Sequence, residues 1–207
     1  MVNYMKIKEY INTKKQFEFY ILNIKQNSAF YEDIITVLSD VIINPFIYQD
    51  NDHTIIISNE VNNEIGQTIN ALADDFGINL KVFKSNKIDS KNVEYLNILK
   101  KLYYKYEEQI SETFITIKHL CLNILEKNID DITVIKPILI NKIMNDAKLL
   151  EIINGMFIND LNVCKTANYV YMHRNTINNK LNVIKEETGL DIQKFQEAVI
   201  LYALIKK

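Results

Sequence analysis

The sequence predicts an α+β protein with an N-terminal α/β part, a long helical connector and an all-helical C-terminal part. Short β-rich apolar runs alternate with helix-period segments between residues 17 and 85, and only helix-period segments follow. The chain has 207 residues, 48% of them hydrophobic, which is enough to bury a core in one large domain or two small ones. We expect divisions at residues 1–92, 93–134 and 135–207.

The N-terminal part predicts alternating strands and helices. A polar turn, Asp50-Asn51-Asp52, separates two short strand-like runs and is typical of a hairpin. Gly77 follows the second helical segment, where a C-terminal glycine is favoured. The expected elements are a strand at 17–24, a helix at 30–42, a hairpin at 45–58, a helix at 63–77 and a strand at 78–85. Their order, β-α-β-β-α-β, is the ferredoxin-like arrangement.

The connector, residues 93–128, carries apolar residues at alternating steps of three and four. This seam predicts one long helix, or two helices end to end. Two interpretations stay open, because the stripe can pack against the chain's own first domain or pair two subunits. Pro137 is expected to mark a break before the last part of the chain.

The C-terminal part predicts four helices. They are expected at 146–160, at 163–170, at 174–189 with Gly189 past its end, and from 191 onward with Asp191 as N-cap. The first should bury Leu149, Leu150, Ile153 and Phe157. The second and third are separated only by the turn Tyr171-Met172.

This pair has the features of a helix-turn-helix. Two closely crossing helices need a small residue at the contact, which Ala167 supplies, and apolar residues around the turn, here Val170 and Met172. At about 100° per residue, an inward face of Ile177, Leu181 and Ile184 leaves an outer face opposite. That outer face holds Asn175, Asn179, Asn182 and Glu186, with Thr176 and Asn178 on its flanks.

The outer face has chemistry suited to the DNA major groove. Asparagine can bond adenine bidentately, and arginine can bond guanine or clamp a phosphate. Arg174 is the only arginine in the sequence, and lysine cannot reproduce its planar fork. Residues 135–207 carry ten Lys or Arg against seven Asp or Glu, whereas the rest carries 14 against 19. A solvated face in an asparagine-rich chain is the simpler alternative.

The segment 162–205 resembles the C-terminal DNA-binding domain of PucR/CdaR-type transcriptional regulators. The resemblance lies in Thr166-Ala167, in the run His173 to Thr176 followed by Ile177, in Thr188 to Asp191, and in the final "AVILYAL". It covers about the last 60 residues. The same region is more distantly similar to the DNA-bending protein Fis.

The resemblance implies that a recognition helix, residues 174–187, reads double-stranded DNA as a homodimer or higher oligomer. The implied DNA-binding residues are Lys165, Thr166, His173, Arg174, Asn175, Thr176, Asn178, Asn179 and Lys180. Family members often carry an aromatic-basic pair in place of Asn179-Lys180, and further arginines in place of Asn182 and Lys185. This chain has fewer cations for phosphate contacts, so its DNA affinity per protomer should be low. A catalytically silent GGDEF-like domain commonly precedes the helix-turn-helix, which makes residues 1–92 a candidate effector-binding regulatory domain.

Other classes are disfavoured. We find no P-loop, GxGxxG or nucleophile elbow, so we expect neither an enzyme nor a cofactor. Asp50, Asp52 and His53 can in principle hold a cation, but a polar turn explains them more simply. Cys121 and Cys164 lack metal-ligand spacing, and no apolar run could span a membrane, so we expect a cytoplasmic protein. Two alternatives to a regulator remain, a protein-interaction module with a degenerate helix-turn-helix and a Fis-like architectural protein.

Overall fold

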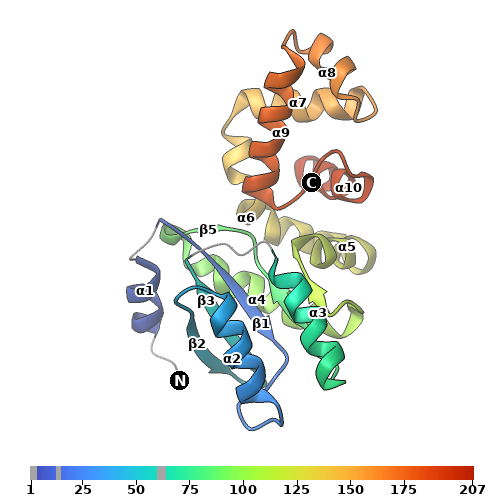
Figure 1. The fold of residues 1–207 in the computed structure, drawn as a ribbon. Helices are drawn as coiled ribbons and strands as arrows, with labels where there is room; N and C mark the ends of the chain where they lie inside the picture. Colours follow the sequence, from blue (N-terminus) through green and yellow to red (C-terminus); the bar gives the residue numbers. More distant parts are fainter. Residues whose placement is uncertain (1–3, 13–14, 60–63) are drawn as a thin grey trace. The chain divides into compact units, whose positions relative to one another are not determined.

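The computed structural model describes residues 4–12, 15–59 and 64–207. The chain divides into two compact units, residues 1–116 and residues 117–207. Unit 1 contains the sheet, and unit 2 is entirely helical (Figure 1). The α+β class predicted from the sequence is therefore confirmed.

Unit 1 is built on the predicted β-α-β-β-α-β order. Its elements are β1 Gln16–Leu22, α2 Tyr31–Val41, β2 Phe46–Asp50, β3 His53–Ser58, α3 Ile65–Phe76 and β4 Val82–Lys84. The strands lie in the order β2-β3-β1-β4, and each neighbouring pair is antiparallel. The two-residue turn pairs Asp50 with His53, as the hairpin signal predicts. Gly77 ends α3 in the left-handed region at φ 60°, which a glycine adopts without a steric cost.

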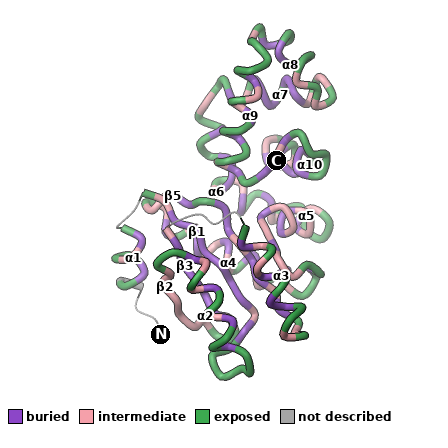
Figure 2. Tube along the Cα trace, in the orientation of Figure 1, coloured by how far each residue is buried: buried purple, intermediate pink, exposed green. Residues whose placement is uncertain are grey.

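The core of unit 1 lies on both faces of this sheet. Side chains of α2 and α3 pack with Tyr20 and Leu22 on one face. On the other face the ring of Phe83 stacks on Tyr103 of α4 (Glu94–Tyr106), with 4.9 Å between centroids. The central strands are accordingly buried along most of their length (Figure 2), as expected for strands covered on both sides.

The connector differs from the continuous helix that the apolar seam suggests. After α4 the chain forms a short 3₁₀ turn, η2 (Glu107–Gln109), and then β6 (Phe114–Ile115), which pairs in parallel with β4. The next helix, α5 (Ile117–Lys127), already belongs to unit 2. Residues 93–134 therefore do not form a separate domain, because β6 completes the sheet of unit 1. The remaining elements of unit 1 are α1 Tyr4–Asn12, β5 Ile88–Asp89 and η1 Ser90–Asn92.

Unit 2 continues with η3 Ile129–Asp131, α6 Ile132–Met144, α7 Ala147–Ile158, α8 Val163–Tyr169, α9 Arg174–Thr188 and α10 Phe195–Lys206. The predicted break at Pro137 is wrong, because this proline lies inside α6. A proline inside a helix removes its own backbone donor and crowds the carbonyl four residues earlier, which together cost about 3 kcal/mol. Ile135, Leu139 and Ile143 of the same helix are buried, and this packing outweighs the missing hydrogen bond.

Two finer predictions for unit 2 also need correction. In α7, Leu149 and Ile153 are buried as expected, but Ile152 and Met156 complete the stripe while Leu150 and Phe157 are only half-buried. Helix α7 packs against three helices, α6, α8 and α9, so its buried face is wider than the single stripe expected for a surface helix. Asp191 does not cap α10. Its carboxylate accepts from the backbone N–H of Gln193 at 3.1 Å, within a turn that precedes the helix.

Candidate nucleic-acid interface

The pair α8 and α9 forms a helix-turn-helix held by apolar contacts. Ala167 and Val170, at the end of α8, are 5% and 4% exposed. Ile177 and Ile184 of α9 are fully buried, which confirms the inward face predicted for this helix. Both helices pack on α7, and α9 also packs on α6. The opposite face of α9 is left to solvent.

The turn between the helices is closed by backbone hydrogen bonds. The N–H of Met172 donates to the carbonyl of Ala167 at 2.9 Å. Tyr171 stands in the left-handed region at φ 53°, with its side chain 96% exposed. His173 caps α9, because its Nδ1 accepts from the N–H of Asn175 at 3.2 Å.

Most of the residues that were predicted to contact DNA lie on the surface of this motif. Arg174 is the first residue of α9, where the N-terminal end of the helix dipole carries partial positive charge. The exposed members of the predicted set are Lys165, His173, Arg174, Asn175, Thr176 and Asn179. Asn178 and Lys180 are half-buried. The structure thus brings eight of the nine residues to the accessible sides of α8, the turn and α9.

Thr166 is the exception. Its side chain is fully buried, and its hydroxyl donates to the carbonyl of Gly155 in α7 at 3.2 Å. A side chain enclosed in this way cannot reach a DNA backbone. Its role is to hold α8 against α7, so we remove Thr166 from the interface.

The cations of this surface differ from five other lysines of unit 2, each of which lies close to a carboxylate. No described residue forms an ion pair with Lys165, Arg174 or Lys180. By contrast, Lys142, Lys148, Lys185, Lys194 and Lys207 each lie 2.6–3.5 Å from a carboxylate oxygen. Three cations without an ion-pair partner therefore lie on α8 and the first half of α9, and Lys118, Lys136 and Lys206 are the further lysines of unit 2 with none among the described residues.

The acidic residues of α9 lie at its other end. Glu186 is exposed, and the carboxylate of Glu187 pairs with Lys142 at 2.6 Å. Charge along the outer face thus changes from positive near Arg174 to negative in the last turn. A phosphate backbone would be attracted by the first half of the helix and repelled by the second.

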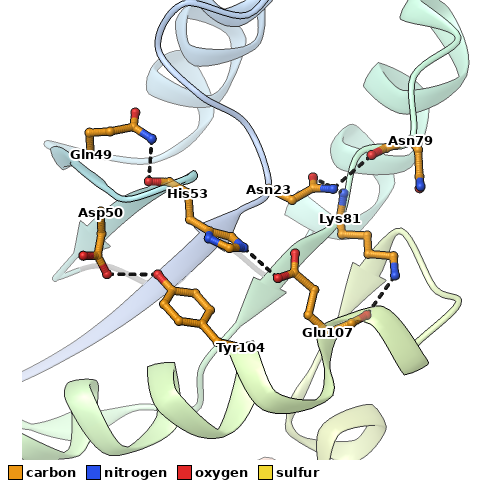
Figure 3. A network of polar contacts seen from close by, with 8 residues as sticks. All are labelled: Asn23, Gln49, Asp50, His53, Asn79, Lys81, Tyr104 and Glu107. Carbon is orange, nitrogen blue, oxygen red and sulfur yellow. Dashed lines mark hydrogen bonds and ion pairs between the residues drawn. The ribbon is translucent and has the colours of Figure 1, made fainter.

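Unit 1 contains a second polar cluster, at the tip of the β2–β3 hairpin (Figure 3). The carboxylate of Asp50 lies 2.8 Å from Lys100 Nζ and 3.0 Å from the hydroxyl of Tyr104. Partial burial raises the pKa of Asp50, but the hydrogen bonds from Lys100 and Tyr104 and the Lys100 charge outweigh burial, so the pKa lies below its usual value. His53 Nε2 lies 2.6 Å from a carboxylate oxygen of Glu107, and its ring stacks on Tyr104.

The hairpin groups considered for a cation are therefore engaged elsewhere. Asp50 faces Lys100, His53 faces Glu107, and Asp52 lies 2.7 Å from Lys25. Among the described residues, no group of three or more His, Cys, Asp or Glu is arranged to hold a metal ion. None of the helices in the described ranges combines the length and the apolar composition needed for a bilayer crossing.

Asn23, Lys81 and Glu107 complete this cluster; the sequence did not mark Asn23 or Lys81, and Glu107 was expected to face solvent but is only 13% exposed. Asn23 directly follows β1, Lys81 directly precedes β4, and Glu107 begins η2, so no local motif joins them. Only the strand order brings these segments together.

The comparison with known protein families agrees with the geometry of unit 2. Residues 149–206 match the family model of the PucR C-terminal helix-turn-helix domain. Among solved structures, the regulator of polyketide synthase expression from Bifidobacterium adolescentis is similar over 97% of this chain and 84% of its own, at 13% identity and a TM-score of 0.43. A search of curated proteins gave no match. The matched residues include α8, the turn and α9, so unit 2 of this chain holds a PucR-type helix-turn-helix domain, the DNA-binding domain of a transcription regulator.

Proposed function

We propose that this protein is a cytoplasmic regulator that binds specific DNA sequences through the first half of α9, as a dimer or higher oligomer. The observation that supports the proposal best is the set of three unpaired cations on the motif, Lys165, Arg174 and Lys180. Because carboxylates neutralise the neighbouring lysines but not these three, they are available for phosphates.

The exposed amides supply the means to read bases. Asn175 and Asn179 are one helical turn apart on the exposed side of α9. Each can donate to adenine N7 and accept from its N6 amino group. Arg174, at the entrance of the helix, can bond guanine or a phosphate with two parallel hydrogen bonds. We therefore expect an A·T-rich half-site bordered by a guanine or by a tight phosphate contact.

The small number of cations argues for more than one copy on the DNA. Three phosphate contacts correspond to a slope of about −2.7 in log K against log salt concentration, and a dimer to about twice that. A single copy with only three phosphate contacts would bind DNA weakly at physiological salt. Two copies on repeated half-sites would add their contacts and their base readout.

The test begins with mapping of the bound DNA in cells, together with light scattering to determine the oligomeric state. The recovered site is then used in fluorescence anisotropy titrations. Replacing Arg174 by alanine should weaken specific binding by about 1–3 kcal/mol, or roughly 5–150-fold. Arg174→Lys should recover only part of the loss, since it keeps the charge and loses the planar fork.

The matched control is Lys148→Ala, which also removes one positive charge from unit 2 but acts on α7. Circular dichroism should show the same helix content for all variants, because each side chain is at the surface. Unchanged retention of the recovered site by Arg174→Ala would exclude α9 as the reader. Recovery of no repeated site would favour the protein-interaction or architectural alternatives.

A further inference from the structure

Unit 1 has a polar cavity of about 440 Å³ at one end of its sheet. The end of β1, the hairpin tip and the start of β4 meet there, because Leu22 pairs with both Thr54 and Val82. Loop residues after β1, residues before β4 and the turn η2 complete the wall. Its size lies within the range of small-molecule sites in proteins.

The wall of the cavity is fixed by hydrogen bonds between distant segments. The side chain of Asn23 donates to the carbonyl of Asn79 at 3.1 Å and accepts from the N–H of Lys81 at 2.6 Å (Figure 3). Lys81 Nζ donates to the carbonyl of Glu107 at 2.8 Å. His53 and Glu107, only 16% and 13% exposed, join the hairpin to η2. A ligand would thus meet groups that are already positioned.

Most charges of the wall are already matched, and two are not. Lys25 pairs with Asp52, and His53 lies against Glu107. The ammonium of Lys81 contacts only a backbone carbonyl among the described residues, and the carboxylate of Glu108 contacts no described partner. One positive and one negative charge therefore remain available.

Two neutral groups add to this pair. The hydroxyl of Ser28 and the side-chain amide of Asn79 also line the cavity, and neither is bonded to a described side chain or backbone group. Both can donate a hydrogen bond to a carboxylate beside Lys81 or accept one from an ammonium beside Glu108.

The chemistry of the wall excludes simpler ligands. All nine lining residues are polar, so an apolar molecule would gain little by entering. Three carboxylates against two lysines disfavour a simple anion. Among the described residues, no three or more His, Cys, Asp or Glu side chains are arranged to hold a metal ion, which disfavours a metal here. A molecule that carries both a carboxylate and an ammonium matches what remains.

We propose that this cavity binds a small zwitterion of the α-amino acid class, with its carboxylate toward Lys81 and its ammonium toward Glu108. The proposal concerns unit 1 and stands whether or not α9 reads DNA. If both hold, the cavity is the site at which an amino acid acts on the regulator.

The test uses the full chain and each of the twenty common α-amino acids as separate probes in thermal-shift and calorimetric titrations. At least one should raise the unfolding midpoint and give a saturable heat. For that amino acid, the methyl ester, which lacks the carboxylate, and the N-acetyl derivative, which lacks the ammonium, should each bind at least tenfold more weakly. Equal binding of either derivative, or no response to all twenty, overturns the proposal.

Two variants locate the site. Lys81→Met and Glu108→Gln should each weaken binding of the active amino acid at least tenfold. Lys101→Met and Glu94→Gln make the same chemical changes on exposed positions of α4 that do not line the cavity, and should leave binding unchanged. Lys81→Met also removes the hydrogen bond from Lys81 to the carbonyl of Glu107, so Glu108→Gln, at an exposed residue, is the decisive variant. Full binding by Glu108→Gln would contradict the assignment.

Discussion

Replacing Thr166 by valine separates packing from DNA binding at a residue that sequence similarity assigned to the interface. The change keeps the volume of the side chain and removes its hydroxyl. That hydroxyl donates one buried hydrogen bond, to the carbonyl of Gly155. Valine should therefore lower the free energy of unfolding, but should not change contacts with DNA.

The size of the effect depends on what is left unsatisfied. The carbonyl of Gly155 also accepts from the backbone N–H of Asn159 at 3.0 Å and from its side-chain amide at 2.8 Å. No acceptor is orphaned by the substitution, so the loss should be in the lower part of the usual range, about 0.5–1 kcal/mol.

Thr166→Ser is the complementary variant. It keeps the hydroxyl and removes the methyl group, Cγ2, which lies 3.1 Å from the position that a Cβ on Gly155 would occupy. Loss of one buried methyl should cost about 1 kcal/mol, with a further contribution from any cavity.

Urea denaturation followed by circular dichroism measures both losses, and anisotropy titrations of the folded variants measure DNA affinity. We expect lower midpoints and unchanged affinity for both. The reasoning is refuted if Thr166→Val keeps its stability and yet loses tenfold or more in DNA affinity.

Three further predictions concern charge, thiol reactivity and helix orientation. Asp50→Asn should lower the free energy of unfolding by about 1 kcal/mol at pH 7. Because the pKa of Asp50 is lower in the native protein, this stability is present above the pKa of the unfolded chain, about 3.9, and is lost as the pH falls through the native pKa. Denaturation curves of the variant and the wild type should therefore converge in acid, and a difference that persists there would contradict this account. Cys164 is exposed, whereas Cys121 is buried and burial raises the pKa of its thiol. A thiol reagent should therefore modify one cysteine in the native protein and two in urea. Immediate modification of both in the native protein would contradict the burial of Cys121. Ile184→Ala should lower the free energy of unfolding in urea by about 2–5 kcal/mol, because Ile184 is fully buried. The neighbouring Val183 is 40% exposed, so Val183→Ala should change it by no more than about 0.5 kcal/mol. Equal losses for the two variants would mean that α9 is oriented differently.

Local signals were sufficient for much of the fold. The Asp50-Asn51-Asp52 turn identified the hairpin, and Gly77 and Gly189 identified two helix ends, because each signal depends on a few adjacent residues. The inward face of α9 was also predictable, since a helix of 15 residues repeats its apolar spacing several times. The residues opposite that face are the exposed ones.

Features that depend on distant segments were not predictable. Phe114 and Ile115 read as part of a helical seam, and only their pairing with β4 makes them a strand. Pro137 breaks helices locally, yet the packing of α6 keeps it inside one. Thr166 lies in a helix of seven residues, which is too short for a periodicity to show which side is buried.

The turn before α9 contains a strained residue, Tyr171, whose replacement should stabilise the protein. Six residues other than glycine adopt positive φ in the described ranges, and three of them are Asn or Asp, which tolerate that region. Phe30 packs its ring on Phe76, and Leu161 is half-buried. Tyr171 has neither a tolerant side chain nor a packing partner around its ring, which is almost wholly in solvent. For protein engineering this is the position of choice, since asparagine there would relieve a strain of about 1 kcal/mol and disturb no packing.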